Sequence, residues 1–258
     1  MQSRSHDGVK LCFEEAGTGG PPLLLVHGWT CDHTYMAPQF AHFQETHRVI
    51  AVDLRGHGQS DKPEQDYTMA GFADDLVWLC GQLAVEKPVV IGHSMGGVIA
   101  VALAALFPEV PSAIVTLDSP IVLAQAFRAG FDPLIKALKT PQYREAQRQF
   151  VSDGLFLPTD DPARKARIVE EMSSAPQHVM SSAFESTVSS DNEDMVEKCQ
   201  VPFLVLLAAQ PLSDVPRLQK LCPEAVIGQT VGAGHFHQLE VPAQVNAMLE
   251  RFLATSAS

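Results

Sequence analysis

The sequence predicts an α/β protein with a mostly parallel sheet, helices on both faces of that sheet, and a helical cap insertion. Short apolar runs bounded by Gly, Pro or Asp recur along the chain, as expected of strands buried on both faces. Segments with apolar residues at helical spacing lie between them, which favours right-handed crossovers between parallel strands. This alternation is interrupted once, between residues 119 and 200.

Five apolar runs are the predicted strands, at residues 23–26, 49–52, 89–91, 113–117 and 203–207. Two helices are predicted where apolar residues recur every three or four positions and so share one face. The first such set is Phe72, Leu76, Leu79 and Leu83, and the second lies within residues 245–252.

The interrupted segment carries helix starts in place of strands. Asp132-Pro133, Thr140-Pro141 and Asp161-Pro162 each place a good N-cap residue before a proline at the first helical position. We therefore expect a helical cap over residues 119–200, carried on a core formed by residues 1–118 and 201–258.

Composition excludes several classes of function. With 46% hydrophobic and 19% charged residues over 258 positions, the chain is too apolar for a disordered protein. Its net charge of −12 opposes binding to nucleic acid and to anionic membranes. The longest apolar run, residues 98–107, is too short for the ~20 residues that cross a bilayer, and the polar N-terminus lacks the apolar core of a secretory signal. We expect a cytoplasmic protein, whose oligomeric state the sequence leaves open.

The strongest chemical motif is Gly92-His93-Ser94-Met95-Gly96, which follows an apolar strand and precedes an apolar helical run. A G-x-S-x-G sequence in this context is typical of a sharp strand–turn–helix connection. Small residues on both sides of the serine allow the strained turn, and the hydroxyl then stands clear of the sheet. The first turn of the helix directs free N–H groups towards an oxyanion. Ser94 is therefore the candidate nucleophile.

Four pieces of the sequence, in this order, make the chain similar to the α/β-hydrolase superfamily: residues 23–29, 53–60, 92–97 and 232–236. The resemblance covers nearly the whole length and implies the α/β-hydrolase fold. It also implies that the backbone N–H groups of Trp29 and Met95 form an oxyanion hole. His27 is interpreted as a residue that stabilises its loop. His57 lies in a turn that contains several glycines and is assigned no catalytic role.

His235 is the candidate general base, because it lies in a glycine-bracketed loop and preserves the order serine, acid, histidine. Its neighbour His237 fits a surface histidine better. The acid is ambiguous: the strand at residues 203–207 has no acid after it until Asp214, whereas Asp118 directly ends the preceding strand, a position that some relatives use. We favour Asp118, since Asp214 also suits a helix N-cap.

No metal site is expected. Five scattered cysteines include no C-x-x-C pair, so they are interpreted as reduced thiols rather than as a disulfide framework or a zinc site. The H-x-H pair of His235 and His237 has no third ligand at metal spacing.

The leading hypothesis is a serine hydrolase that needs no cofactor and cleaves a small ester or lactone, such as an acyl homoserine lactone. Trp29 and the cap residues Phe127, Phe131 and Phe156 are candidate substrate-binding residues, and the cap also contains Phe150 and Phe184, which could line the same apolar pocket. All five phenylalanines would equally fit a purely structural role in the core of the cap.

Two alternatives stay open. Trp29-Thr30-Cys31-Asp32-His33, with an acid at Asp118, is similar to cofactor-free dioxygenases that cleave 3-hydroxy-4-quinolone rings on this fold. Cys31 and Met95 depart from that pattern. A non-catalytic small-molecule receptor is the other alternative, which the complete set of candidate catalytic residues disfavours.

Overall fold

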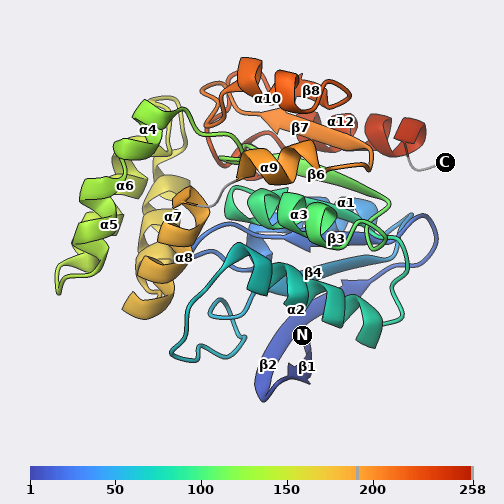
Figure 1. The fold of residues 1–258 in the computed structure, drawn as a ribbon, viewed down its shortest axis with the longest axis horizontal. Coiled ribbons are helices and arrows are strands. Elements are labelled where there is room, and N and C mark those ends of the chain that lie inside the picture. The colour runs from blue at the N-terminus through green and yellow to red at the C-terminus, as the bar shows by residue number, and fades with distance from the viewer. Residues whose placement is uncertain (190–191, 257–258) are drawn as a thin grey trace.

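The computed structural model describes residues 1–189 and 192–256, which fold around an eight-stranded sheet of order β1-β2-β4-β3-β5-β6-β7-β8 (Figure 1). The strands are β1 (Gln2–His6), β2 (Val9–Ala16), β3 (Leu23–Val26), β4 (Val49–Asp53), β5 (Val89–His93), β6 (Ala113–Leu117), β7 (Phe203–Leu207) and β8 (Val226–Gln229). Strand β2 pairs antiparallel with β1 and β4, and all other pairs are parallel. The predicted fold class is confirmed.

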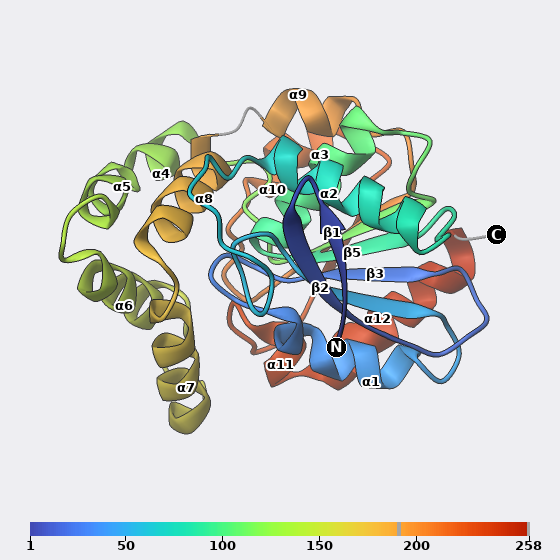
Figure 2. The same cartoon turned by 90° about the horizontal axis from the view of Figure 1, so that it is seen from below.

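Helices cover both faces of the sheet, as Figure 2 shows. One face carries α1 (Ala37–Phe43) and α12 (Pro242–Ser256), and the other carries α2 (Met69–Gln82), α3 (Met95–Leu106) and α9 (Asn192–Glu197). Successive residues of β3 point to opposite faces, so Leu23 and Leu25 join one apolar cluster while Leu24 and Val26 join the other. Short elements complete the core: η1 (His33–Met36), α10 (Val215–Leu221) and α11 (His237–Glu240).

The segment between β6 and β7 is helical and forms a lobe at one side of the sheet (Figure 1). The lobe consists of α4 (Gln125–Ala129), α5 (Asp132–Leu138), α6 (Tyr143–Gly154), α7 (Pro162–Ser173) and α8 (Gln177–Ser189). The last helix of the segment, α9, lies against α3 instead of the lobe. We keep residues 119–200 as the proposed extent of the cap.

One of the three predicted N-caps in the cap is confirmed. Asp161 accepts a hydrogen bond from the Arg164 N–H at 2.6 Å and begins α7. The prediction is wrong for Asp132, which lies inside α5, and for Thr140. The Thr140 hydroxyl donates to the Ala137 carbonyl at 2.8 Å and so closes the preceding helix; α6 starts only at Tyr143.

Across residues 1–189 and 192–256, none of the helices combines the length and the apolar character that crossing a bilayer demands.

Candidate active site

Ser94 lies at the turn between β5 and α3 in a strained backbone conformation, with φ 53° and ψ −119°. The residues two positions before and after it must be glycine: a Cβ on Gly92 would lie 2.1 Å from the Gly96 carbonyl oxygen, and one on Gly96 would lie 2.3 Å from that of Val26. The Ser94 N–H donates to the Leu117 carbonyl at 2.9 Å, which ties the turn to the neighbouring strand end. This is the geometry that presents a serine hydroxyl above a sheet.

His235 and Asp118 are in direct contact. The ring Nδ1–H of His235 donates to Asp118 Oδ2 at 2.8 Å, and the two side chains are 6% and 1% exposed. The other carboxylate oxygen of Asp118 accepts the Ala208 N–H at 3.1 Å. Because Nδ1 carries the hydrogen in this contact, Nε2 of the neutral ring keeps a lone pair that can accept a proton.

Asp214, the alternative acid, lies at the start of α10. Its carboxylate accepts the Arg217 N–H at 3.0 Å and caps that helix. Its backbone N–H donates to the Val122 carbonyl at 2.8 Å. Asp214 therefore has the capping role that its sequence position also suggests, and the carboxylate that contacts His235 is Asp118.

His93 also supports the His235 loop, a contact that sequence reasoning missed. Its Nε2–H donates to the His235 carbonyl at 3.0 Å, and the two rings lie 4.7 Å apart. Complete burial holds the pKa of His93 well below its usual value, so the ring is neutral. The only signal in the sequence was the histidine at the first variable position of the G-x-S-x-G motif.

The N–H groups of Trp29 and Met95 are free to bind an oxyanion. Among the described residues, neither has a hydrogen-bond partner. The two residues line one cavity together with Ser94. Gly28 brings the loop after β3 against the serine, because a Cβ there would lie only 3.1 Å from the Ser94 Cβ. Two donors beside a nucleophile are the arrangement that stabilises a tetrahedral oxyanion.

The other histidines near the site are held in structural contacts. Nε2 of His27 accepts the Leu54 N–H at 3.1 Å while its Nδ1–H donates to the Gly28 carbonyl at 2.8 Å. Burial lowers the pKa of His57 to about 3, and its Nδ1–H donates to the Arg55 carbonyl at 2.9 Å.

The prediction of a surface position for His237 is wrong. Its side chain is fully buried at the start of α11, and burial lowers its pKa to about 4. The ring Nδ1 lies 3.0 Å from the Thr230 hydroxyl. The physical reason is that α11 packs against α12 and η1, which turns the ring inward from a loop that looks polar in the sequence.

Ser94 and His235 border a largely apolar cavity of about 250 Å³ between core and cap. Aromatic rings dominate its wall: Trp29, Phe127, Phe131, Phe150 and Phe184. Of the predicted substrate-binding residues, only Phe156 lies elsewhere. It borders a second cavity of about 180 Å³ on the Asp118 side of His235 and stacks on Phe236 at 5.3 Å.

A polar cluster joins the cap to the His235 loop. Glu240 accepts the Gly234 N–H at 2.9 Å, and Arg164 of α7 lies 3.3 Å from Asp160 and 3.9 Å from Glu240. Burial, together with the neighbouring Asp160 carboxylate, raises the pKa of Glu240. The residue preceding His235 is thus held by Glu240, which in turn contacts Arg164 of the cap.

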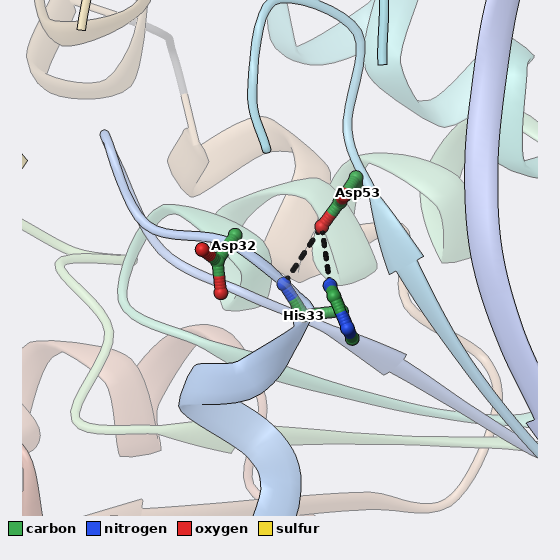
Figure 3. Close-up of side chains that lie close together, drawn as sticks. All are labelled: Asp32, His33 and Asp53. Atoms are coloured by element: carbon green, nitrogen blue, oxygen red, sulfur yellow. Dashed lines mark hydrogen bonds and ion pairs between the residues drawn. The ribbon is translucent and has the colours of Figure 1, made fainter. Parts of the chain in front are cut away.

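Asp32, His33 and Asp53 form a compact group (Figure 3). Asp32 caps η1, His33 is the first residue of η1, and Asp53 is the last residue of β4. Asp53 Oδ1 accepts both the N–H and the Nδ1–H of His33, at 2.9 and 2.8 Å, and Oδ2 accepts the Gln59 N–H. Although burial opposes it, these hydrogen bonds lower the pKa of Asp53 to about 2, while the Asp53 contact raises the pKa of His33. Asp32 accepts two donors of Thr34. Hydrogen bonds thus account for this group, and we assign it no metal.

Comparisons with known proteins agree with this geometry. Residues 21–242 match a family model described as alpha/beta hydrolase fold. The chain is 25% identical to 3-oxoadipate enol-lactonase 2 of Acinetobacter baylyi over 90% of both chains. It is 27% identical to Est816, described as an N-acyl homoserine lactone degrading enzyme, with a TM-score of 0.82 over 97% of this chain and 100% of that one. Bifunctional epoxide hydrolase 2 of Sus scrofa is 25% identical over 97% of this chain and 54% of that protein.

Proposed function

Because the chain belongs to the α/β-hydrolase fold family, we propose that it is a serine hydrolase that cleaves a carboxylic ester or lactone through an acyl-enzyme on Ser94. One observation carries the proposal. The serine on the strained turn borders the same cavity as His235, whose Nδ1–H is bonded to the Asp118 carboxylate. A serine nucleophile, a histidine base and an aspartate that orients the histidine are the groups that a Ser-His-Asp hydrolase uses.

In the proposed reaction, Ser94 Oγ attacks the carbonyl carbon while His235 Nε2 takes up the hydroxyl proton. Asp118 stabilises the imidazolium that forms, through the 2.8 Å contact at Nδ1. The carbonyl oxygen becomes an oxyanion beside the N–H groups of Trp29 and Met95. His235 then donates its proton to the departing alkoxide, which leaves an ester on Ser94. Water, deprotonated by His235, hydrolyses that ester and regenerates the serine.

The nucleophile favours acyl transfer over epoxide opening, although two relatives are called epoxide hydrolases. If Ser94 opened an epoxide, the product would be an ether, which a water molecule activated by histidine does not cleave. An ester or lactone carbonyl instead gives an acyl-serine that can turn over. The buried thiol of Cys31 does not compete as nucleophile, because burial raises its pKa well above the usual value.

Lactones are supported as substrates by two relatives of similar length, an enol-lactonase and an acyl homoserine lactone degrading enzyme. The name enol-lactonase describes ring-opening acyl transfer, which the same residues would perform with the alcohol kept in the product. The proposal needs no cofactor, and its substrate is a small molecule.

The test is hydrolysis of uncharged 4-nitrophenyl esters and N-acyl homoserine lactones by the wild type and two serine variants. Ser94→Ala should lose several orders of magnitude in kcat, as removal of a triad nucleophile does. Ser119→Ala is the matched control, a buried serine on the neighbouring strand end, and should keep its activity. Equal activity of Ser94→Ala and wild type would refute the proposal.

A second candidate is the cofactor-free dioxygenase that cleaves 3-hydroxy-4-quinolones. The Asp118–His235 contact favours it, because such a reaction needs a histidine–aspartate pair to deprotonate the substrate. Oxygen consumption with a hydroxyquinolone, retained in Ser94→Ala and lost in His235→Ala, would identify this activity. No oxygen uptake is the result expected for a serine hydrolase.

A further inference from the structure

We propose that the substrate is an uncharged ester whose acyl group carries an aromatic ring, and that this ring lies in the cavity formed by Trp29 and the cap phenylalanines. The proposal rests on the serine hydrolase function above and names the substrate class for that site. It depends on three observations: the charge of the cavity wall, the arrangement of its rings, and the different surroundings of His235 on its two sides.

The wall of the main cavity carries no Lys, Arg, Asp or Glu among the described residues. A substrate carboxylate in this cavity would lose its water without gaining a cationic partner, which strongly disfavours binding. The chain as a whole adds to this effect, since its 30 acidic residues outnumber its 18 Lys and Arg and repel anions on approach. Uncharged acyl groups are therefore selected.

The rings form a rigid box. The Trp29 Nε1–H donates to the Met180 carbonyl at 2.9 Å, which fixes the indole against α8. The Trp29 ring centroid lies 4.7 Å from that of Phe184 and 6.3 Å from that of Phe150. Phe131 stands edge-on to Phe184 at 5.5 Å and to Phe150 at 6.0 Å. These distances show that the rings pack on one another into a continuous aromatic wall. An aromatic guest gains ring–ring contacts with such a wall that a saturated ring of similar size does not gain.

The acyl side of the ester belongs in this box. Trp29 and Met95, whose N–H groups would hold the carbonyl oxygen, line the aromatic cavity and do not line the second one. His235, which must protonate the leaving oxygen, lines both cavities. A carbonyl held at the two N–H groups thus places its acyl group among the rings and directs the alcohol towards the second cavity, beside Phe156.

Charge is tested with two methyl esters of nearly the same shape, methyl (4-nitrophenyl)acetate and methyl (4-carboxyphenyl)acetate. We expect kcat/KM to be at least about a hundredfold lower for the carboxylate, the cost of an unpaired buried charge. Phe127→Arg adds a cation at a wall position that is 46% exposed, so the fold should tolerate it. This variant should reduce the difference in kcat/KM between the two esters. Equal kcat/KM values in the wild type would overturn the proposal.

The role of the ring is tested by comparing the hydrolysis of methyl phenylacetate with that of methyl cyclohexylacetate, measured as the release of acid. We expect about a three- to tenfold preference for the aromatic acyl group, from ring–ring contacts. Phe150→Leu should reduce the preference, and Phe107→Leu, at the far end of α3, should not. For benzyl acetate against cyclohexylmethyl acetate, Phe150→Leu should leave any preference unchanged, because the ring is on the alcohol side, beside Phe156.

A preference for the saturated acyl group, or an aromatic preference only on the alcohol side, would overturn this assignment while the serine hydrolase function stands. Failure to hydrolyse any of these neutral esters, with no Ser94-dependent activity, would instead refute the function itself.

Discussion

Exchange of Asp118 for Asn separates the catalytic acid from a merely structural aspartate. The Asp118 carboxylate accepts the Ala208 N–H through Oδ1 and the His235 Nδ1–H through Oδ2. In Asp118→Asn the amide oxygen can keep the Ala208 contact, so the amide NH2 faces His235. Nδ1 must then act as acceptor, which moves the ring hydrogen to Nε2 and removes the lone pair that takes the serine proton.

The expected loss in kcat is about 10⁴-fold, the effect of the same exchange in a Ser-His-Asp triad, or about 5.4 kcal/mol of transition-state stabilisation. Stability should change little, because the Ala208 contact survives. Asp214→Asn is the matched control, since asparagine caps a helix as well as aspartate does, and its kcat should stay near that of the wild type.

The assay is steady-state hydrolysis of an uncharged ester, with urea unfolding of each variant to exclude a folding defect. The reasoning is refuted if Asp118→Asn keeps its kcat or if Asp214→Asn suffers the larger loss.

Three further results are expected. His93→Phe should lower kcat about two- to tenfold with little change in KM, because it removes one hydrogen bond that holds the His235 loop; an effect on KM alone would contradict this. Arg164→Ala should lower the free energy of unfolding by about 2 kcal/mol, since it leaves buried carboxyl groups without their cation. Arg167→Ala, which removes an exposed ion pair on the same helix, should lower it by about 0.5 kcal/mol or less. Equal losses would contradict a role for the polar cluster. Burial lowers the pKa of His57 to about 3, so the stability that the neutral ring contributes is present above the unfolded-state pKa of about 6.5 and is lost as the pH falls towards 3. Below pH 6, His57→Gln should therefore reduce the slope of the unfolding free energy against pH by about 1.4 kcal/mol per pH unit. An unchanged slope would contradict this expectation.

The elements predicted best from the sequence are those buried on both sides. The central strands β3 to β7 are wholly buried and mostly apolar, so their composition predicts them. Strands β1 and β8 escaped prediction because their residues are largely exposed at the sheet edges and carry no apolar run. β2 alternates with exposed charged residues, which hides it in the same way.

The candidate site was predictable where local geometry dictates residue type. Only glycine fits two positions before and two positions after Ser94. An aspartate at a strand end reaches a neighbouring loop, which is why Asp118 could be predicted. Contacts between distant segments left no local signal. His93 supports the His235 loop across 142 positions, and Phe156 does not line the cavity that Phe127, Phe131, Phe150 and Phe184 share.

The central claim is that an acyl group is transferred to Ser94, and mass spectrometry tests it most directly. Wild-type protein is mixed with an uncharged 4-nitrophenyl ester, quenched with acid during turnover, and digested. We expect the peptide that contains Ser94 to gain the mass of the acyl group, and no such peptide in Ser94→Ala. Turnover of the ester with no adduct on Ser94, or with the adduct on another residue, would contradict the account.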